Sequence, residues 1–179
     1  RVIDVDRRAG AWRAREAADA VAAGLNIPTA HGSYDAVFAE REVDIIYSAT
    51  PHPRHVAPAL AALDAGKHVL IEKPITVNAS EAAAIRDRAA EKGLLAMEAM
   101  WTRFLPHMKR IHEILDAGTI GEIRVISADH TQSTSTDPAH RMNALELGGG
   151  ALLDLGIYPL SFVHDILGTP TTIQASARF

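Results

Sequence analysis

Residues 65–74 of the chain read Ala-Gly-Lys-His-Val-Leu-Ile-Glu-Lys-Pro, and this stretch decides the fold. Its apolar centre, His68 to Glu72, is typical of a strand buried in a sheet. A helix is predicted just before it, from His55 to Ala65, because apolar residues recur there at helical spacing and Gly66 follows its end. Strands that alternate with helices indicate parallel pairing through helical crossovers.

The same alternation extends outward on both sides of this stretch. Strands are predicted over 1–5, 43–49 and 94–98, and helices over 11–23, 34–40 and 78–91. The run 43–49 is almost continuously apolar, as in a strand covered on both faces. Gly24 is expected to end the first helix, and Asn78 with Glu81 forms a capping-box pattern at the start of another. The sequence therefore predicts an α/β fold with a Rossmann-type parallel sheet.

The pattern changes near Met100. An amphipathic helix is predicted over 105–117, followed by strand-like alternation over 121–131 and again over 171–179. Between them, a helix should run from the glycines at 148–150 to Leu167, with an interruption at Pro159. We therefore expect an α/β part over 1–100. The residues 101–179 should begin an α+β part with an open, mostly antiparallel sheet.

Composition excludes several classes of protein. The 179 residues carry a net charge of -4 and no cysteine, so a disulfide framework and a thiolate metal site are excluded. The scattered basic residues argue against a nucleic-acid surface. No apolar run approaches the roughly 20 residues that cross a membrane, and the N-terminus carries no apolar signal segment. His52 and His55 lack a zinc spacing, so no metal is expected. The chain is predicted to be soluble and cytoplasmic.

Lys73 is the first candidate for catalysis, because it follows a buried strand. Open α/β sheets bind their ligands beyond the carboxyl ends of the strands. A partly desolvated lysine at this place can exchange a proton with a ligand. A solvated lysine that merely ends the strand is the alternative.

Asp154 and Tyr158 are the second candidates. They lie four residues apart in a helical pattern and so share one face. A carboxylate and a phenol in this arrangement can hold or relay a proton at a substrate hydroxyl. An exposed aspartate beside a packing tyrosine is the alternative. The glycines at 148–150 allow a close approach of backbone, or form a flexible entry to the helix.

Other residues are candidates for cofactor binding. The loop Thr50-Pro51-His52-Pro53, with His55, leads into a helix N-terminus that can receive a phosphate, although two prolines also make a stiff turn without a ligand. Asp6 can bind a ribose hydroxyl and Arg7 a 2′-phosphate, with a surface acid–base pair as the alternative. Trp101 and Arg103 are further candidates, or else core and surface residues at a domain junction.

Four segments, in this order, resemble the glucose–fructose oxidoreductase and inositol dehydrogenase family, Gfo/Idh/MocA. They are residues 43–51, 65–74, 118–122 and 148–159. The segment Met97 to Pro106 is most similar to the dimeric dihydrodiol dehydrogenase branch. Tyr158 agrees with that branch, since inositol dehydrogenases carry histidine at this position.

The resemblance implies an NAD(P)-dependent dehydrogenase that moves a hydride between nicotinamide and a hydroxyl-bearing carbon of a sugar, polyol or cyclic diol. Lys73 and Tyr158 would handle the hydroxyl proton, while Asp154 orients the substrate or Lys73. The bond before Pro74 is expected to be cis. The cofactor is NAD or NADP, and Arg7 together with the branch favours NADP. Cofactor contacts are expected from Thr50, Pro51, His52, His55, Glu72, Lys73, Pro74, Trp101, Arg103 and Arg141.

The sequence also departs from the family pattern. It contains no G-x-G-x-x-G turn, and the second-domain sheet of the family needs strands beyond Phe179. The resemblance therefore implies a partial NAD(P)-binding Rossmann domain over 1–100 that lacks its first strand, and part of a second domain over 101–179. His140-Arg141 stands where a Trp-Arg pair is usual. We therefore expect weak or no dinucleotide binding by the 179-residue chain, and a non-catalytic remnant or interaction module is the alternative function. The expected partners are a small polyhydroxyl substrate and further copies of the chain in a dimer or tetramer, without nucleic acid or membrane.

Overall fold

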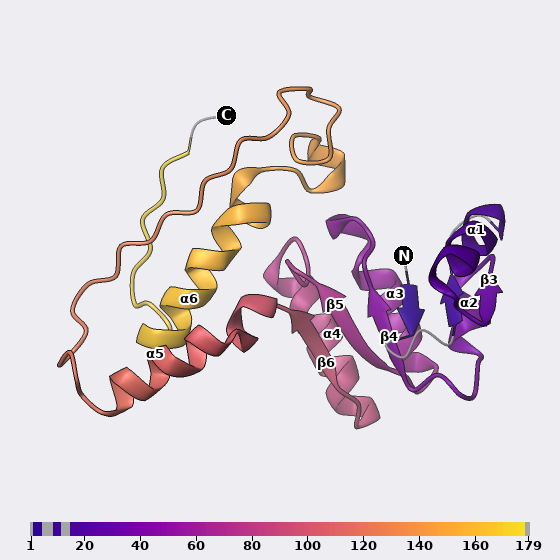
Figure 1. Cartoon of the computed structure of the whole chain (residues 1–179), viewed down its shortest axis with the longest axis horizontal. Coiled ribbons are helices and arrows are strands. Elements are labelled where there is room, and N and C mark those ends of the chain that lie inside the picture. The colour runs from indigo at the N-terminus through magenta and orange to yellow at the C-terminus, as the bar shows by residue number, and fades with distance from the viewer. Residues whose placement is uncertain (1, 5–8, 12–14, 178–179) are drawn as a thin grey trace.

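The computed structural model of the chain describes residues 2–4, 9–11 and 15–177. A sheet of six strands in the order β3-β2-β1-β4-β5-β6 forms the first part of the molecule. Helices and long extended connections form the part after residue 100 (Figure 1). The strands are β1 (Val2–Asp4), β2 (Ala9–Ala11), β3 (Thr29–His31), β4 (Ile45–Ser48), β5 (His68–Glu72) and β6 (Ala96–Ala99).

The predicted parallel pairing is confirmed for most of the sheet. Strand β2 is parallel to β3, and β4, β5 and β6 are parallel to one another. Strand β1 differs, because it lies between β2 and β4 and is antiparallel to both. Only four residues separate β1 from β2. A parallel connection needs about a dozen residues or more, so neighbouring strands joined this closely pair antiparallel.

Four helices accompany the sheet in the first part of the chain: α1 (Arg15–Leu25), α2 (Tyr34–Phe38), α3 (Val56–Asp64) and α4 (Ala79–Lys92). The prediction that Gly24 ends the first helix is wrong, because α1 continues through Leu25 and Asn26 adopts the left-handed conformation with φ of 54°. The capping prediction for α4 is confirmed. The Asn78 side chain accepts a hydrogen bond from the Glu81 amide at 2.9 Å, and Gly93 at the other end has φ of 66°.

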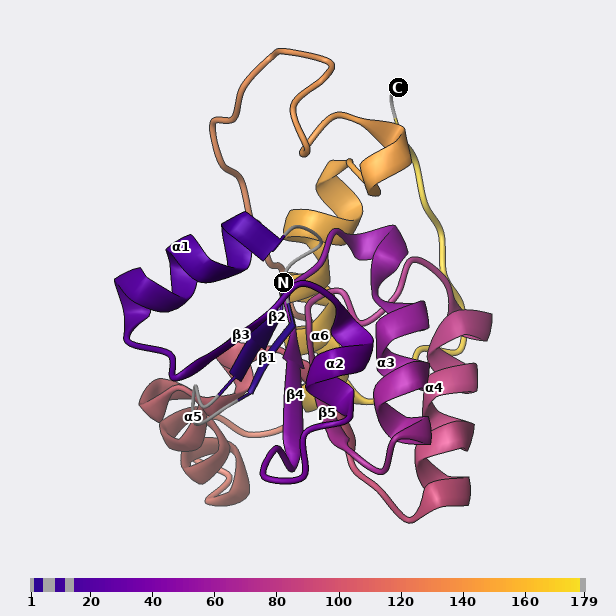
Figure 2. The same cartoon turned by 90° about the vertical axis from the view of Figure 1, so that its right-hand side faces the viewer.

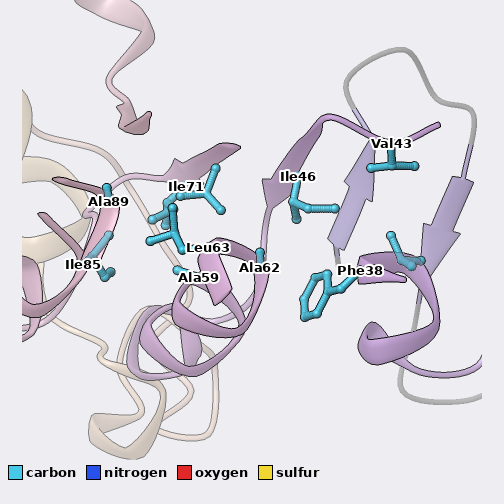
Figure 3. Packing of buried hydrophobic residues seen from close by; sticks show 11 residues of the cluster. Phe38, Val43, Ile46, Ala59, Ala62, Leu63, Ile71, Ile85 and Ala89 are labelled. Atoms are coloured by element: carbon cyan, nitrogen blue, oxygen red, sulfur yellow. The ribbon is translucent and has the colours of Figure 1, made fainter. Parts of the chain in front are cut away.

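The core lies between the sheet and the helices α2, α3 and α4 (Figures 2 and 3). Alternate residues of the central strands face these helices, as the period of two in a strand requires. Ile46 of β4 and Ile71 of β5 are both fully buried there. The helices contribute Phe38, Ala59, Ala62, Leu63, Ile85 and Ala89. This packing fixes the direction in which β4 and β5 deliver their carboxyl ends.

The opposite face of the central strands is less covered than the continuous apolar pattern predicts. Ile45 of β4 is 36% exposed, and Met97 of the edge strand β6 is 47% exposed. The fully buried residues of β4 and β5 instead alternate with half-buried or exposed ones. Helices α3 and α4 pack against each other, so they cover one face together.

The second part of the described chain differs from its prediction. It contains η2 (Trp101–Phe104), α5 (Pro106–Asp116), η3 (Leu145–Leu147), η4 (Leu152–Gly156) and α6 (Ile157–Leu167). The strands expected over 121–131 and 171–177, and with them the antiparallel sheet, are not formed among these residues. Val125 is 81% and Ile173 78% exposed, so neither segment has an apolar face buried. A strand forms only where a neighbour satisfies its backbone groups.

The predicted interruption of the last helix at Pro159 is wrong. Helix α6 runs through it, and the preceding turn η4 is a π-helix. Pro159 follows closely on this π-helical turn, where the regular hydrogen bonding of an α-helix is already replaced, so its missing N–H is tolerated. The wide turn and the α-helix therefore join without a break between Asp154 and Tyr158.

Helices α5 and α6 are joined by polar contacts. Arg103, in η2, donates to the Ser161 hydroxyl at 2.8 Å and lies 3.6 Å from the Asp165 carboxylate. His112 of α5 lies 2.9 Å from the other oxygen of Asp165. These contacts hold α6 against the segment that follows β6.

Among the described residues, one stretch, Leu145–Leu167, is long and apolar enough to cross a membrane, judged by length and composition alone. The expectation that no apolar run approaches this length does not hold for this stretch. It includes Asp154, which is buried against Lys73 of the first part of the chain. A pairing of this kind ties the stretch to the sheet.

The cap of α4 gives a direct test of the fold. Asn78→Ala should lower the free energy of unfolding by about 1 kcal/mol, because the Glu81 amide loses its acceptor. Asn78→Asp should keep most of the stability, since it keeps an acceptor oxygen in the same place. Urea unfolding followed by circular dichroism measures both variants. Equal stability of Asn78→Ala and the wild type would contradict the assignment of this cap.

Candidate active site

The candidate site lies where the parallel strands β4 and β5 end. A cavity of about 340 Å³ opens there, a size that suits a small ring-shaped ligand. Residues from both strand ends and from the second part of the chain line it. They are Ala49, Thr50, Pro51, His52, Glu72, Lys73, Arg141, Leu147 and Asp154. Half of the predicted site residues therefore meet at one place.

Lys73 and Asp154 form the central contact of the cavity. The Lys73 ammonium donates to the backbone oxygen of Asp154 at 2.6 Å and to its carboxylate Oδ1 at 3.2 Å. The two side chains are only 13% and 7% exposed. The solvated lysine and the exposed aspartate, which were the alternatives from sequence, are both excluded by this burial.

Two more side chains approach the same carboxylate oxygen. Arg141 Nη1 lies 3.5 Å and His52 Nε2 4.0 Å from Asp154 Oδ1. Burial alone would raise the pKa of Asp154. The hydrogen bond and the charge of Lys73, aided by Arg141 and His52, outweigh it and hold the pKa of Asp154 below its ordinary value. The carboxylate is therefore ionised across the physiological range.

His52 is a buried, neutral neighbour of this pair. Burial lowers the pKa of His52, although its hydrogen bond with the Gly148 carbonyl at 3.3 Å acts in the opposite direction. Gly148 has φ of 71°, and a Cβ atom there would lie 3.0 Å from the His52 Cβ. The glycines therefore serve the close approach of backbone that was one of the two readings from sequence. Gly149 is equally tight, with backbone of Ala144 2.8 Å from a Cβ position.

Tyr158, one helical turn after Asp154, also lies beside Lys73. The Lys73 ammonium is 4.7 Å from the centre of the phenol ring, within the range of a cation–π interaction. The Tyr158 hydroxyl accepts a hydrogen bond from the Trp101 indole at 3.1 Å. His130 packs against the same ring, with ring centres 5.0 Å apart. One amine thus contacts both Asp154 and Tyr158, as their shared helix face predicts.

Glu72 is held by a residue that the sequence analysis missed. Its Oε1 accepts a hydrogen bond from the Tyr47 hydroxyl, and its Oε2 accepts one from the Lys73 amide at 3.2 Å. Burial and the neighbouring Glu72 raise the pKa of Tyr47 to about 12, so the phenol remains a donor. The register offered a signal, because Tyr47 pairs with Leu70 and Glu72 is two residues further along the same face.

Four predicted cofactor residues lie away from the cavity lining. His55 is fully buried behind it, and Pro74 is buried after a cis peptide bond, as expected for this bond. Trp101 reaches the site only through Tyr158, and Arg103 contacts α6. Asp6 and Arg7 lie outside the described residues.

The sheet order and the strand-end cavity define a protein of the dinucleotide-binding, Rossmann-type class. The model of the oxidoreductase family with an NAD-binding Rossmann fold matches residues 9–100, and that of the GFO/IDH/MocA C-terminal domain matches residues 108–179. The chain belongs to the GFO/IDH/MocA family. This confirms the family that the four sequence segments indicate.

The chain is similar to several known proteins. Trans-1,2-dihydrobenzene-1,2-diol dehydrogenase of Bos taurus is 41% identical over 155 residues, which are 86% of this chain and 46% of that protein. D-xylose 1-dehydrogenase (NADP(+)) of Hypocrea jecorina is 38% identical over 166 residues, with 83% and 42% covered. A 3-ketoreductase from Actinomadura kijaniata, solved with NADP and TDP-benzene, is 34% identical with a TM-score of 0.80, covering 89% of this chain and 49% of that one. The chain spans about half the length of the curated relatives it matches.

The buried carboxylate predicts a pH-dependent contribution to stability. Because the folded state lowers the pKa of Asp154, its ionisation stabilises the fold above the ordinary aspartate pKa of about 3.9. This contribution is lost as the pH falls through the lower pKa of the folded state. Asp154→Asn should therefore cost about 1.5–3 kcal/mol at pH 7, where it removes a charged acceptor, and progressively less in acid.

Urea unfolding of the wild type and of Asp154→Asn, from pH 7 down into acid, measures the difference in their free energies of unfolding. Asp165→Asn is the matched control, because Asp165 also forms an ion pair with a cation, Arg103, but is more exposed. A cost of Asp154→Asn that stays constant down to the lowest pH would contradict the assignment of its pKa.

Proposed function

We propose that this chain is part of an NAD(P)-dependent oxidoreductase acting on a hydroxyl-bearing carbon of a sugar, polyol or cyclic diol. One observation carries the proposal: the buried Lys73 ammonium contacts both Asp154 and Tyr158 beside the strand-end cavity. A hydroxyl that enters the cavity meets the Lys73 ammonium, and the Tyr158 phenol lies next to that ammonium, so the two groups together can exchange the hydroxyl proton. The names of the similar proteins, which include diol and sugar dehydrogenases and a ketoreductase, support this reaction class.

The cavity fits the nicotinamide end of a dinucleotide. The nicotinamide ring would be held by Thr50, Pro51, His52, Glu72 and Arg141, which line the cavity. Such a ligand lies at the carboxyl ends of parallel strands in this fold class. When bound, the cofactor supplies or accepts the hydride. NADP is favoured by the cofactors that the names of two similar proteins print.

The residues of the chain would divide the remaining work. On reduction, the Lys73 ammonium or the Tyr158 phenol gives a proton to the oxygen that becomes the hydroxyl. On oxidation, the same groups accept the hydroxyl proton in their deprotonated forms, amine or phenolate, after they have lost a proton to solvent. Asp154 holds the Lys73 ammonium through two oxygen atoms and so fixes its direction. His52, uncharged in its buried place, adds an acceptor beside this pair. His55 supports the loops rather than contacting the ligand.

The wider organisation follows the same proposal. Residues 1–100 would carry the cofactor, and residues 101–179 would begin the domain that binds substrate and further copies of the chain. The partner is a small polyhydroxyl molecule in the cytoplasm, and the assembly is a homo-oligomer, a dimer or tetramer. Neither nucleic acid nor a membrane has a role in it.

The 179-residue chain itself should bind a dinucleotide weakly or not at all. Its sequence contains no G-x-G-x-x-G turn, whose glycines let backbone approach the pyrophosphate. Titration with NADPH, followed by nicotinamide fluorescence, measures the affinity. Binding in the micromolar range would contradict this prediction. Absence of binding by the full gene product would instead favour the non-catalytic remnant or interaction module.

Lys73→Met tests the proposed chemistry in the full gene product. Turnover should fall by about 10²-fold or more, because the proton-transfer group is lost. The affinity for NADPH should change little. Lys67→Met is the matched control, since Lys67 also donates to a backbone oxygen, that of Glu40, but lies at the other end of β5. Unchanged turnover of Lys73→Met would remove Lys73 from the mechanism.

A further inference from the structure

The short segment Lys73-Pro74-Ile75, which we call the lysine loop, is bonded at one peptide group from two sides. The Pro74 carbonyl oxygen lies 2.9 Å from His55 Nδ1, and the amide of the same peptide group, Ile75 N–H, donates to Glu98 Oε1 at 2.8 Å. His55 comes from the segment before α3 and Glu98 from β6. Two separate elements therefore hold the plane of the peptide that follows Lys73-Pro74.

The His55 side of this arrangement is rigid. The ring is fully buried, and its other nitrogen, Nε2, lies 2.8 Å from the Thr50 carbonyl oxygen. His55 therefore connects the loop after β4 with the lysine loop after β5. Both ring nitrogens face backbone oxygens of these two loops, so the ring does not point into the cavity.

The Glu98 side is a charge-assisted hydrogen bond from a neighbouring strand. Glu98 pairs with Ile71 in the parallel register, close to the end of β6. A carboxylate acceptor gives a stronger hydrogen bond than a neutral one. Since the proline ring fixes φ at Pro74, fixing the next peptide plane leaves the backbone beside Lys73 little freedom.

We propose that Glu98, together with His55, is a positioning residue that sets the place of the Lys73 ammonium beside Asp154 and Tyr158. The inference rests on the proposed function for its catalytic consequence. The structural claim, that Glu98 and His55 set the position of Lys73, does not depend on the proposed function, because the position of Lys73 can be measured directly. Glu98 does not line the strand-end cavity, and its hydrogen bond to the Ile75 amide connects it to the lysine loop.

Chemical labelling of lysines reports the position of Lys73 in the chain. The sequence contains Lys67, Lys73, Lys92 and Lys109, so mass spectrometry resolves the acetylation rate of each. Glu98→Met has similar length but no acceptor oxygen. It should raise the acetylation rate of Lys73 relative to Lys67 by about tenfold, because the amide loses a charged acceptor. Glu98→Gln keeps an acceptor oxygen and should restore a rate near that of the wild type.

Glu81→Met is the matched control variant. Glu81 also accepts from a backbone amide, that of Val77, but this amide lies beyond the lysine loop. The control should leave the ratio of the Lys73 and Lys67 rates unchanged. An unchanged ratio in Glu98→Met would overturn the proposal. An equal rise at all four lysines would also overturn it, since it would show general destabilisation.

Turnover in the full gene product gives the second readout. Glu98→Met should lower kcat by about 10²-fold, the size of loss expected from misplacing a catalytic group, with the KM for NADPH little changed. Glu98→Gln should restore most of kcat. An increase in KM with kcat unchanged would overturn the positioning role. If Lys73→Met keeps full turnover, Lys73 has no part in the proposed mechanism, while the labelling ratio still decides whether Glu98 positions Lys73.

Discussion

The contact between Lys73 and Asp154 connects the two parts of the molecule. Lys73 ends a strand whose direction is fixed by the core, and Asp154 lies in the π-helical turn that leads into α6. An ammonium and a carboxylate removed from water are costly to bury, and each is acceptable only because the other is present. The position of α6, and with it Tyr158, follows from satisfying this pair. The cavity beside the strand ends therefore forms where this pair holds the second part of the chain against the sheet.

Much of the sheet could be predicted, because its signals are local. Strand β5 coincides with the predicted range, and α4 begins and ends at the residues whose side chain or backbone suits a cap, Asn78 and Gly93. Gly24 failed as an end signal because a glycine is tolerated inside a helix when Asn26 can take the left-handed conformation after it. The antiparallel β1 could not be seen from alternation, because it depends on the length of the connection to β2.

The sequence predicted several residues that gather at the candidate cavity, but not the residues that hold them in place. Lys73, Asp154 and His52 stand at strand ends and helix starts, where sequence patterns are informative. Tyr47 and Glu98 stand within strands, and their roles depend on register between strands that are far apart in sequence. The expected strands after residue 120 show the opposite limit. Their alternation is clear, yet a strand also needs a partner, and no described segment pairs with them.

The buried ring of His55 has a consequence for protein engineering. Because it joins the backbone of the loop after β4 to that of the loop after β5, these loops form one mechanical unit. A library that varies residues 50–53 alone would change the loop after β4 while the lysine loop, to which His55 connects it, stays the same. Exchange of cofactor or substrate preference between relatives should therefore transfer both loops together with the histidine that joins them.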